Sequence, residues 1–314
     1  MALSEFDLIA EYFSTTGRPR EDVVLGVGDD CALLRVPPGV DLAATVDTLI
    51  EGVHFLPGCD PENLGYKALA VNLSDLAAMG ASPAWATLAL TLPAVDPDWL
   101  RSFSRGFGGL AESCGIQLVG GDTTRGNLSV TVQVHGFVDA RQALRRDGAK
   151  PGQLIGVTGS LGDAGLALLA LRGEYHAGAC LEDLQQRLER PLPRLEAGAA
   201  LTGVASAAID ISDGLLADLG HIGSRSGTGA ELDLALLPLS PCVAAYVQQT
   251  GDWTLPLSAG DDYELCVTVA PERRLLAEDR VRQTGCLLTW IGVRCRRPDG
   301  TRLDPGARGY EHFG

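Results

Sequence analysis

Lysine is almost absent from this 314-residue sequence, in which Lys67 and Lys150 are the only lysines among 25 basic residues. A P-loop requires a lysine between a glycine and a serine or threonine, and a protein kinase requires a His-Arg-Asp loop. The sequence contains neither motif. P-loop nucleotide-binding proteins and protein kinases are therefore excluded as functional classes.

Paired cysteine motifs and long apolar runs are also missing. The eight cysteines include no Cys-x-x-Cys pair, so the sequence predicts neither a structural zinc site nor a redox motif. We expect these dispersed thiols to be small buried apolar side chains of a cytosolic enzyme. The N-terminus carries Glu5 and Asp7 where a signal peptide needs basic residues, and no apolar run approaches the length of about 18 residues typical of a membrane span. The first residues are predicted to form an amphipathic helix of a cytoplasmic protein.

Positive charge is in short supply, because the formal net charge is -15. This argues against a nucleic-acid partner and against binding to an anionic membrane. The excess of acidic residues serves either solubility or cation binding, and composition leaves both open. A chain of 314 residues, 46% of them hydrophobic, exceeds the size at which a single core usually stops growing. We therefore expect a globular protein of two domains.

Predicted strands and helices alternate in both halves of the chain, which indicates an α/β or α+β class. Residues 63–80 are predicted to form a buried helix that begins at an asparagine cap and ends at a glycine. A Gly/Pro turn at residues 145–152 predicts a boundary between an N-terminal domain, 1–148, and a C-terminal domain, 149–314. The pattern leaves the strand order open.

Aspartates recur at the ends of apolar segments or within them, where a solvated charge is not expected. They are Asp29, Asp30, Asp47, Asp75, Asp122, Asp210, Asp213, Asp261 and Asp262. Each one alone is better explained as a helix cap or a turn residue. Taken together they need a counter-charge, because two carboxylates about 4 Å apart repel by roughly 4 kcal/mol at an effective dielectric near 20. With lysine almost absent, metal ions are the natural source of that charge.

Oxygen ligands without a histidine or cysteine cluster indicate a hard cation. No EF-hand pattern is present, and Mg²⁺ commonly combines one or two carboxylates with water and substrate phosphates. The sequence therefore favours several Mg²⁺ ions bridging a polyphosphate.

Two glycine-rich segments are candidates for binding that phosphate. Gly120 and Gly121 precede Asp122, and residues 159–165 place three glycines between a predicted strand and a predicted helix. Tight packing of the strand against the helix explains the second segment equally well. Arg146, in the interdomain turn, could pair with a phosphate oxygen or be an ordinary surface arginine.

Several motifs together resemble the thiamine-monophosphate kinase family, which belongs to the ATP-binding superfamily that includes aminoimidazole ribonucleotide synthetase. They are "GVGDDCALL", "TVDTLIEGVHF", "YKALAVNLSDLAAMGASPAW", "LVGGDTTRG", "AIDISDGLLADLGHI", "GDDYELCVTV" and the terminal "GYEHF". The resemblance covers essentially the whole chain. It implies transfer of the γ-phosphoryl group of ATP to thiamine monophosphate in a Mg²⁺-dependent homodimer, with an N-terminal mixed sheet at the dimer interface and a C-terminal α/β domain.

The resemblance also implies roles for individual residues. It assigns the magnesium ligands to Asp30, Thr45, Val46, Asp47, Asp75, Asp122, Asp210 and Asp213. It assigns the ATP contacts to Phe103, Gly121, Asp122, Arg146 and Ser212. It assigns the thiamine monophosphate pocket to His54, Glu264 and Phe313.

The sequence departs from the family pattern at two positions. Val46 stands where the family usually has threonine, so any metal contact there must use its backbone carbonyl. Asp261 stands where the family usually has glutamate, which shortens the side chain by one methylene and keeps the charge.

No catalytic general base is expected for this chemistry. The acceptor phosphate has a second pKa of about 6 and is largely ionised at neutral pH. The site must neutralise two anions and align them, which is the contribution of protein and metal to phosphoryl transfer. Asp30 is then the expected metal ligand of the adjacent pair, and Asp29 is expected to bond to the backbone or to water.

Two other functional classes remain open. A sister synthetase would use the same ATP site for different chemistry, although a selenophosphate synthetase should carry an N-terminal cysteine or selenocysteine with a lysine. A non-enzymatic acidic metal-binding module would need neither the phosphate-binding glycines nor Arg146.

Overall fold

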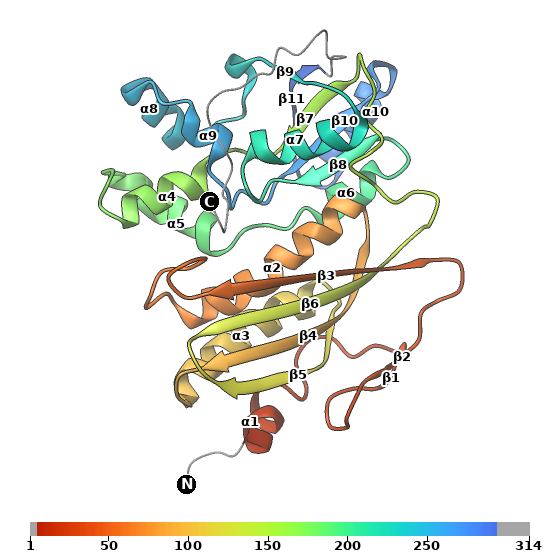
Figure 1. The fold of residues 1–314 in the computed structure, drawn as a ribbon, viewed down its shortest axis with the longest axis vertical. Helices are drawn as coiled ribbons and strands as arrows, with labels where there is room; N and C mark the ends of the chain where they lie inside the picture. Colours follow the sequence, from red (N-terminus) through yellow and green to blue (C-terminus); the bar gives the residue numbers. More distant parts are fainter. Residues whose placement is uncertain (1–4, 294–314) are drawn as a thin grey trace. The chain divides into compact units, whose positions relative to one another are not determined.

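The computed structural model of the chain describes residues 5–293 and divides into two compact units. The first unit comprises Met1–Leu76 and Ala81–Arg141, and the second comprises Ala77–Gly80 and Gln142–Gly314. Both units combine helices with β-sheets (Figure 1), which confirms the predicted mixed α/β class. None of the helices within the described residues is long and apolar enough to cross a membrane.

The first unit is built on a four-stranded sheet with the order β3-β6-β4-β5. Strands β4 and β5 run parallel, and the other neighbours are antiparallel, so the sheet is mixed as expected. The elements along the chain are α1 (Glu5–Tyr12), β1 (Val23–Leu25), β2 (Leu33–Leu34), β3 (Asp41–Ile50), α2 (Pro61–Met79), β4 (Ser82–Leu92), α3 (Pro97–Ser113), β5 (Gln117–Arg125) and β6 (Ser129–Val138). Strands β1 and β2 pair separately in a small antiparallel sheet.

The local sequence accounts for helix α3. Asp96 caps it, because its side chain accepts hydrogen bonds from the backbone N–H groups of Asp98 and Trp99. Leu100, Phe103 and the other apolar residues at helical spacing are buried along one face.

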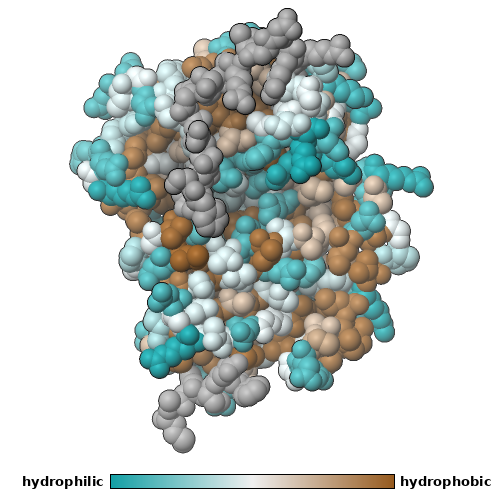
Figure 2. All heavy atoms as spheres, viewed as in Figure 1, coloured by the Kyte–Doolittle hydropathy of each residue, from teal (hydrophilic) through white to brown (hydrophobic). Residues whose placement is uncertain are grey.

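One face of the four-stranded sheet is covered and the other is open. Residues two apart on a strand share a face, so Thr45 and Asp47 of β3 point to one side, and Val46 points to the other. Thr45 bonds to Asp75 of α2, which identifies the covered side, whereas Val46 is 59% exposed. In Figure 1 strands β3, β6 and β4 lie in front of helices α2 and α3, and Figure 2 shows apolar residues spread among polar ones on this open face.

The second unit is built on a five-stranded antiparallel sheet with the order β8-β10-β7-β11-β9. Its strands are β7 (Leu154–Thr158), β8 (Ala207–Asp210), β9 (Glu231–Leu232), β10 (Leu265–Val269) and β11 (Leu288–Val293). Its α-helices are α4 (Asp163–Leu171), α5 (Leu181–Glu189), α6 (Leu195–Leu201), α7 (Leu215–Ser226), α8 (Pro241–Thr250), α9 (Thr254–Ser258) and α10 (Arg274–Gln283). Short 3-10 helices are η1 (Gly178–Cys180), η2 (Leu234–Leu236) and η3 (Pro271–Arg273).

Both faces of the second sheet are buried. Val157 and Cys266 pack in a core with Leu219 of α7, while Val267 packs in a separate core with Val281 of α10. Because apolar residues are needed on both sides, strand β10 is apolar or uncharged along its whole length. Helices therefore lie on both sides of this sheet.

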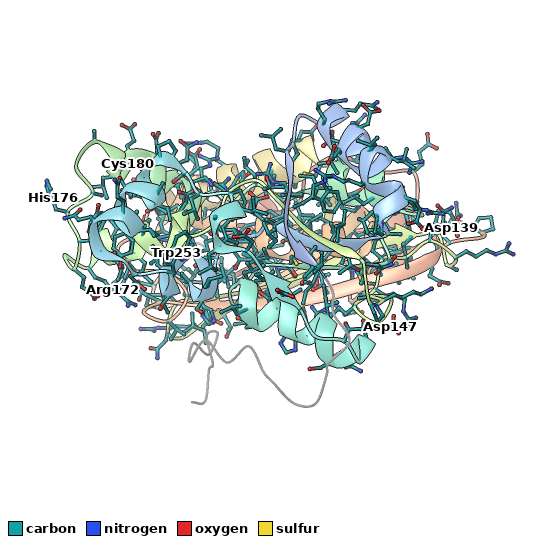
Figure 3. The ribbon with its side chains drawn as sticks, turned by 90° about the horizontal axis from the view of Figure 1, so that it is seen from above. Asp139, Asp147, Arg172, His176, Cys180 and Trp253 are labelled. Atoms are coloured by element: carbon teal, nitrogen blue, oxygen red, sulfur yellow. A yellow bond between two sulfur atoms is a disulfide. The ribbon has the colours of Figure 1, made fainter. Side chains whose placement is uncertain are left out.

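The expectation that all eight cysteines are unpaired apolar side chains is wrong for two of them. Cys180 of η1 and Cys242 of α8 form a disulfide, although 62 residues separate them in sequence. Figure 3 labels Cys180. Cys266 and Cys286 are buried free thiols, whereas Cys31 is exposed. Sequence spacing could not reveal the pair, because two separate helical segments bring these residues together.

Candidate functional site

Three segments of the second unit meet at one edge of its sheet. Leu265, the first residue of β10, pairs with Asp210, the last residue of β8. The backbone N–H of Leu265 also donates to Thr158 Oγ1 at the end of β7, with a distance of 2.8 Å. Because these strand ends are neighbours, the residues that follow β7 and β8 and those that precede β10 lie close together.

Asp218 organises the loop that follows β8. Its Oδ2 accepts hydrogen bonds from the backbone N–H groups of Ser212, at 3.0 Å, and of Asp213, at 3.1 Å. Burial raises the pKa of Asp218 to about 7, and the nearby positive charge of Arg146 opposes that shift. The second unit therefore brings together Arg146, Asp210, Ser212 and Asp213, which are predicted to contact ATP or metal.

The Asp261–Asp262 pair lies beside this loop. The backbone N–H of Asp261 donates to Ser212 O at 2.9 Å, and Asp261 has a φ of 66°, in the left-handed region that non-glycine residues seldom adopt. Asp262 is buried, and both of its oxygens accept from the N–H of Gly162, at 2.9 and 3.1 Å. Burial raises the pKa of Asp262 well above its ordinary value.

These contacts favour the packing explanation of the glycine segment 159–165. A Cβ at Gly159 would collide with the carboxylate of Glu264, and one at Gly165 would collide with Ala259. The N–H of Gly162, at the N-terminus of α4, already binds the Asp262 carboxyl.

Glu264 is predicted to line the substrate pocket, and the structure places it in a dense polar network. Its Oε1 accepts from Nη2 of Arg187, at 2.8 Å, and of Arg194, at 2.6 Å. Its Oε2 accepts from Arg194 Nε, at 2.6 Å, and from Thr158 Oγ1, at 2.7 Å. An ionised carboxylate offers about four lone-pair sites, so these donors occupy its full hydrogen-bonding capacity. Neither arginine belongs to the motifs that predicted the site residues.

The first unit assembles a smaller oxygen-rich group on the covered face of its sheet. Thr45 Oγ1 donates a short hydrogen bond to Asp75 Oδ2, and Asp47 shares the face of Thr45. Asn72 lies one helical turn before Asp75, is fully buried, and has an Oδ1 atom without a hydrogen-bond partner among the described residues. This arrangement supplies oxygen ligands of the kind that Mg²⁺ prefers.

Asp122 lies apart from this group within the sheet. It pairs with the exposed Ala89 and therefore points to the open face. Its strand β5 and the β3 strand of Asp47 form opposite edges of the sheet, roughly 14 Å apart at about 4.8 Å per strand spacing. Gly121 also has a packing role, because a Cβ there would collide with the carbonyl oxygen of Leu88.

Asp30 lies in an exposed turn with Asp29. Asp29 Oδ1 accepts from the backbone N–H of Asp30 at 2.9 Å, which confirms that Asp29 bonds to the backbone. The Asp30 side chain is left at the surface.

Three further residues are predicted to contact a substrate, Phe103 for ATP and His54 and Phe313 for thiamine monophosphate. Phe103 is fully buried in α3 and stacks against Trp99 and Phe107. His54 Nδ1 accepts from the backbone N–H of Ile50 at 3.0 Å, which leaves Nε2 as its other polar atom. Phe313 lies outside the described residues.

Oxygen atoms make up the candidate metal-binding set, and this composition fits magnesium. Within residues 5–293 no group of three or more His, Cys, Asp or Glu side chains is arranged to hold a metal by itself. The Asp75 and Asp210 groups would each offer only part of a coordination shell, as expected where Mg²⁺ completes its octahedron with water and substrate phosphates.

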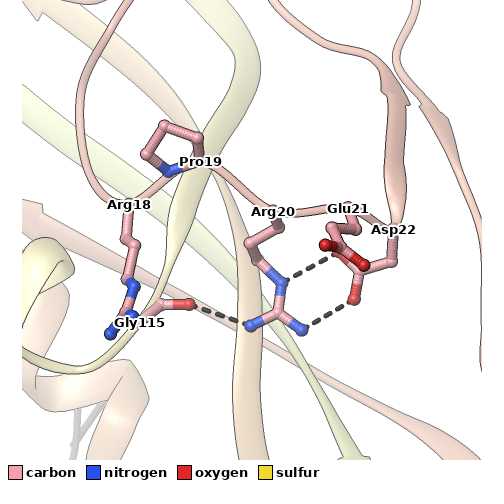
Figure 4. Close-up of a pocket in the computed structure, with 6 residues that line it drawn as sticks. All are labelled: Arg18, Pro19, Arg20, Glu21, Asp22 and Gly115. Carbon is pink, nitrogen blue, oxygen red and sulfur yellow. Dashed lines mark hydrogen bonds and ion pairs between the residues drawn. The ribbon is translucent and has the colours of Figure 1, made fainter.

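A surface recess in the first unit is a separate feature (Figure 4). It is lined by Arg18, Pro19, Arg20, Glu21, Asp22 and Gly115, none of which is a predicted site residue. Arg20 is already committed there, because it donates to both oxygens of Asp22 and to Gly115 O. The hydrogen bond from Arg20 holds the pKa of Asp22 below its ordinary value. The arginine and the aspartate of this recess therefore already bond to each other.

The sequence matches two family descriptions in succession. Residues 28–138 match "AIR synthase related protein, N-terminal domain", and residues 150–301 match "AIR synthase related protein, C-terminal domain". The chain is also 50% identical, over 322 aligned residues, to the thiamine-monophosphate kinase of Escherichia coli strain K12, with coverage of 100% of this chain and 99% of that protein. The chain belongs to the thiamine-monophosphate kinase family. The family indicated by the sequence motifs is thereby confirmed.

Solved structures extend this relationship to the fold. The thiamine-monophosphate kinase of Stenotrophomonas maltophilia K279a is 46% identical, with a TM-score of 0.84 over 88% of this chain and 90% of that one. The structure described as AaThiL complexed with AMPPCP and TMP is 33% identical, with a TM-score of 0.77 over 91% and 92% of the two chains. The E. coli hydrogenase maturation protein HypE, at 20% identity and a TM-score of 0.75, shares the fold alone, with coverage of 98% and 95%.

Proposed function

We propose that this chain transfers the γ-phosphoryl group of ATP to thiamine monophosphate and produces thiamine diphosphate and ADP. The observation that carries the proposal is the 50% identity to a thiamine-monophosphate kinase along the full length of the chain. The 33% identical relative in complex with AMPPCP and TMP supports ATP and thiamine monophosphate as the two substrates. Both substrates carry phosphate, so the site must manage a concentration of negative charge.

The candidate metal ligands come from both units. In the first unit, Thr45, Asp47 and Asp75 lie at the covered face of the sheet, whereas the other candidates, Asp30, Val46 and Asp122, lie elsewhere in that unit. In the second unit they are Asp210 and Asp213. Magnesium bound by these residues would neutralise the phosphates and help to align them for in-line transfer. Asp218 supports this role, because it fixes the backbone of the loop that carries Ser212 and Asp213.

The remaining assignments concern direct contacts with the two substrates. Gly121, Asp122, Arg146, Ser212 and the segment around Phe103 would serve ATP, and His54, Glu264 and Phe313 would serve thiamine monophosphate. No side chain is required as a general base, because the acceptor phosphate is already largely ionised at neutral pH.

We also propose that the chain functions in the cytoplasm as a homodimer through the open face of its N-terminal sheet. Val46 and Ile50 are exposed on this face at 59% and 42%, which supports burial against a second copy. The N-terminal domain, residues 1–148, would bind ATP and magnesium, and residues 149–314 would complete the phosphate and substrate site.

Phosphorus NMR of the purified protein with Mg-ATP and thiamine monophosphate tests the proposal. Thiamine diphosphate and ADP should form in equal amounts, with little free phosphate. ADP with inorganic phosphate, or AMP, while thiamine monophosphate is unchanged, would instead support a sister synthetase. ATP binding that is weak and independent of Mg²⁺, with no turnover, would favour the acidic metal-binding module.

A further inference from the structure

In the network around Glu264, the carboxylate side chains are less exposed to solvent than the arginine side chains. The side chains of Glu264 and Asp163 are 1% and 6% exposed, whereas those of Arg187 and Arg194 are 23% and 18% exposed. The two arginine side chains are therefore more exposed than the carboxylates to which they bond.

Both arginines retain hydrogen-bond donors. Arg194 donates to Glu264 through Nε and Nη2, both at 2.6 Å. Arg187 donates to Glu264 through Nη2 at 2.8 Å, and its Nε lies 3.8 Å from Asp163 Oδ2. A guanidinium group carries five N–H donors. These contacts within residues 5–293 leave the Nη1 amino group of each arginine available to another acceptor.

The position of the network connects it to the candidate site. Thr158, which donates to Glu264, ends strand β7 at the sheet edge described above. The backbone N–H of Ile211 donates to Glu264 O at 2.8 Å, so the network adjoins the loop that carries Ser212 and Asp213. Glu264 therefore links the two arginines to this edge of the sheet.

We propose that Arg187 and Arg194 together bind a phosphate group of a substrate, and that Glu264 is the residue that positions them. The inference rests on the proposed function for the source of the phosphate, which is either thiamine monophosphate or ATP. Planar guanidinium groups match phosphate oxygens in geometry and charge, and fixing them in advance reduces the entropy lost on binding. Glu264 thus contributes to substrate recognition through the arginines.

A purely structural role explains this arrangement less well. A buried ion pair stabilises a fold weakly, because removing the charges from water costs about as much as their attraction returns. Here two arginines, one on α5 and one at the start of α6, both donate to Glu264, and Arg187 also lies beside the buried Asp163. Both arginine side chains keep part of their surface exposed, which buried ion pairing alone does not require.

The test compares Arg187→Lys and Arg194→Lys with the wild-type protein, with Arg274→Lys as the matched control. Arg274 also pairs with a glutamate, Glu278 at 2.8 Å, but on the exposed helix α10. Calorimetric titrations with inorganic phosphate, thiamine monophosphate and unphosphorylated thiamine are measured alongside KM for both substrates and Tm. Substitution by lysine keeps the positive charge but removes the planar guanidinium group and its paired hydrogen-bond donors. If Arg194→Lys does not fold, Arg187→Lys still tests the proposal.

The expected result is about a tenfold rise in Kd for inorganic phosphate in each lysine variant, with thiamine binding and the control unchanged. A rise in KM for thiamine monophosphate alone would assign the site to the acceptor, and a rise for ATP alone would assign it to the nucleotide. Unchanged phosphate affinity with a lowered Tm, or an equal loss of thiamine and phosphate binding, would overturn the proposal. The phosphate titration is independent of turnover, so an inactive wild-type protein would count against the kinase assignment alone.

Discussion

The tripeptide Gly-Asp-Asp occurs twice in this chain and has opposite environments in the two places. Residues 28–30 form an exposed turn in the first unit, where Asp29 bonds to the backbone of Asp30. Residues 260–262 precede a central strand of the second unit, and Asp262 is buried against the N–H of Gly162. The same tripeptide therefore places its last aspartate at the surface in the first unit and in the interior in the second unit.

The segments that follow explain the difference. After Asp30 the chain enters the short strand β2 at the exposed edge of a two-stranded sheet. After Asp262 it enters β10, which has neighbours on both sides and every residue buried. A buried carboxyl needs a proton or fixed donors, whereas an exposed carboxylate can recruit a cation. The exposed first copy is therefore open to a cation, whereas the carboxyl of Asp262 in the second copy is enclosed by protein.

Removing Glu264 should cause the largest loss of stability, because it follows the buried copy by two residues and is itself fully buried. Glu264→Ala leaves two arginines and Thr158 without their acceptor, and the expected cost is about 3–5 kcal/mol in the free energy of unfolding. Urea denaturation measures it. Glu278→Ala, on the exposed helix α10, is the control and should cost about 1 kcal/mol or less. Equal losses in the two variants would contradict the buried network.

The disulfide of the second unit should contribute nearly as much. Replacing Cys180 and Cys242 by serine opens a loop of 62 residues and should lower the free energy of unfolding by about 2–4 kcal/mol. Thermal unfolding with and without a reducing agent measures the effect, and Cys31→Ser beside the exposed Asp30 is the control. Because cytosolic disulfides are rare, thiol titration of the denatured, unreduced protein is decisive. All eight cysteines reacting would disprove the bond, whereas two fewer would support it.

The exposed copy should show the reverse pattern, a loss of activity without a loss of stability. Asp30→Asn should reduce turnover by about a hundredfold and raise the Mg²⁺ concentration needed, while the free energy of unfolding changes by about 0.5 kcal/mol or less. Asp75→Asn should also keep the fold and reduce turnover by orders of magnitude. Steady-state kinetics over a Mg²⁺ series measures both, with Asp139→Asn as an exposed control. Activity near that of the wild type would remove the substituted residue from the metal site.

Local features of this structure were predictable from sequence. The helix predicted over residues 63–80 occurs at Pro61–Met79, and the bond from Asp30 to Asp29 was among the expected alternatives. Both depend on residues a few positions apart, where backbone geometry determines which groups meet.

Long-range features were not predictable. The contact of Arg187 with Glu264 spans 77 residues, and it depends on how α5 packs against α4, away from Glu264 in sequence. Asp122 points to the open face after a register shift between β4 and β5, and one extra residue reverses the side of every later side chain. The alternation of polar and apolar residues along one strand does not reveal such a shift in its pairing with a neighbour. Tertiary packing decided these outcomes.

The smallest predicted effect separates the two copies by pH. Burial raises the pKa of Asp262 in the folded protein, so the folded state holds a proton that the unfolded state releases above about pH 4. Stability contributed by this group is therefore lost as pH rises above that value, until the folded pKa is passed. Asp262→Asn mimics the neutral acid and keeps an oxygen for the N–H of Gly162, so the variant should gain stability relative to the wild type as the pH rises from about 4 toward the folded pKa, by up to about 1.4 kcal/mol for each pH unit. Denaturation at several pH values measures the difference, and Asp29→Asn in the exposed copy should show no such trend. A constant difference for Asp262→Asn across this range would mean that the buried carboxyl is ionised and that its neighbours already compensate its charge.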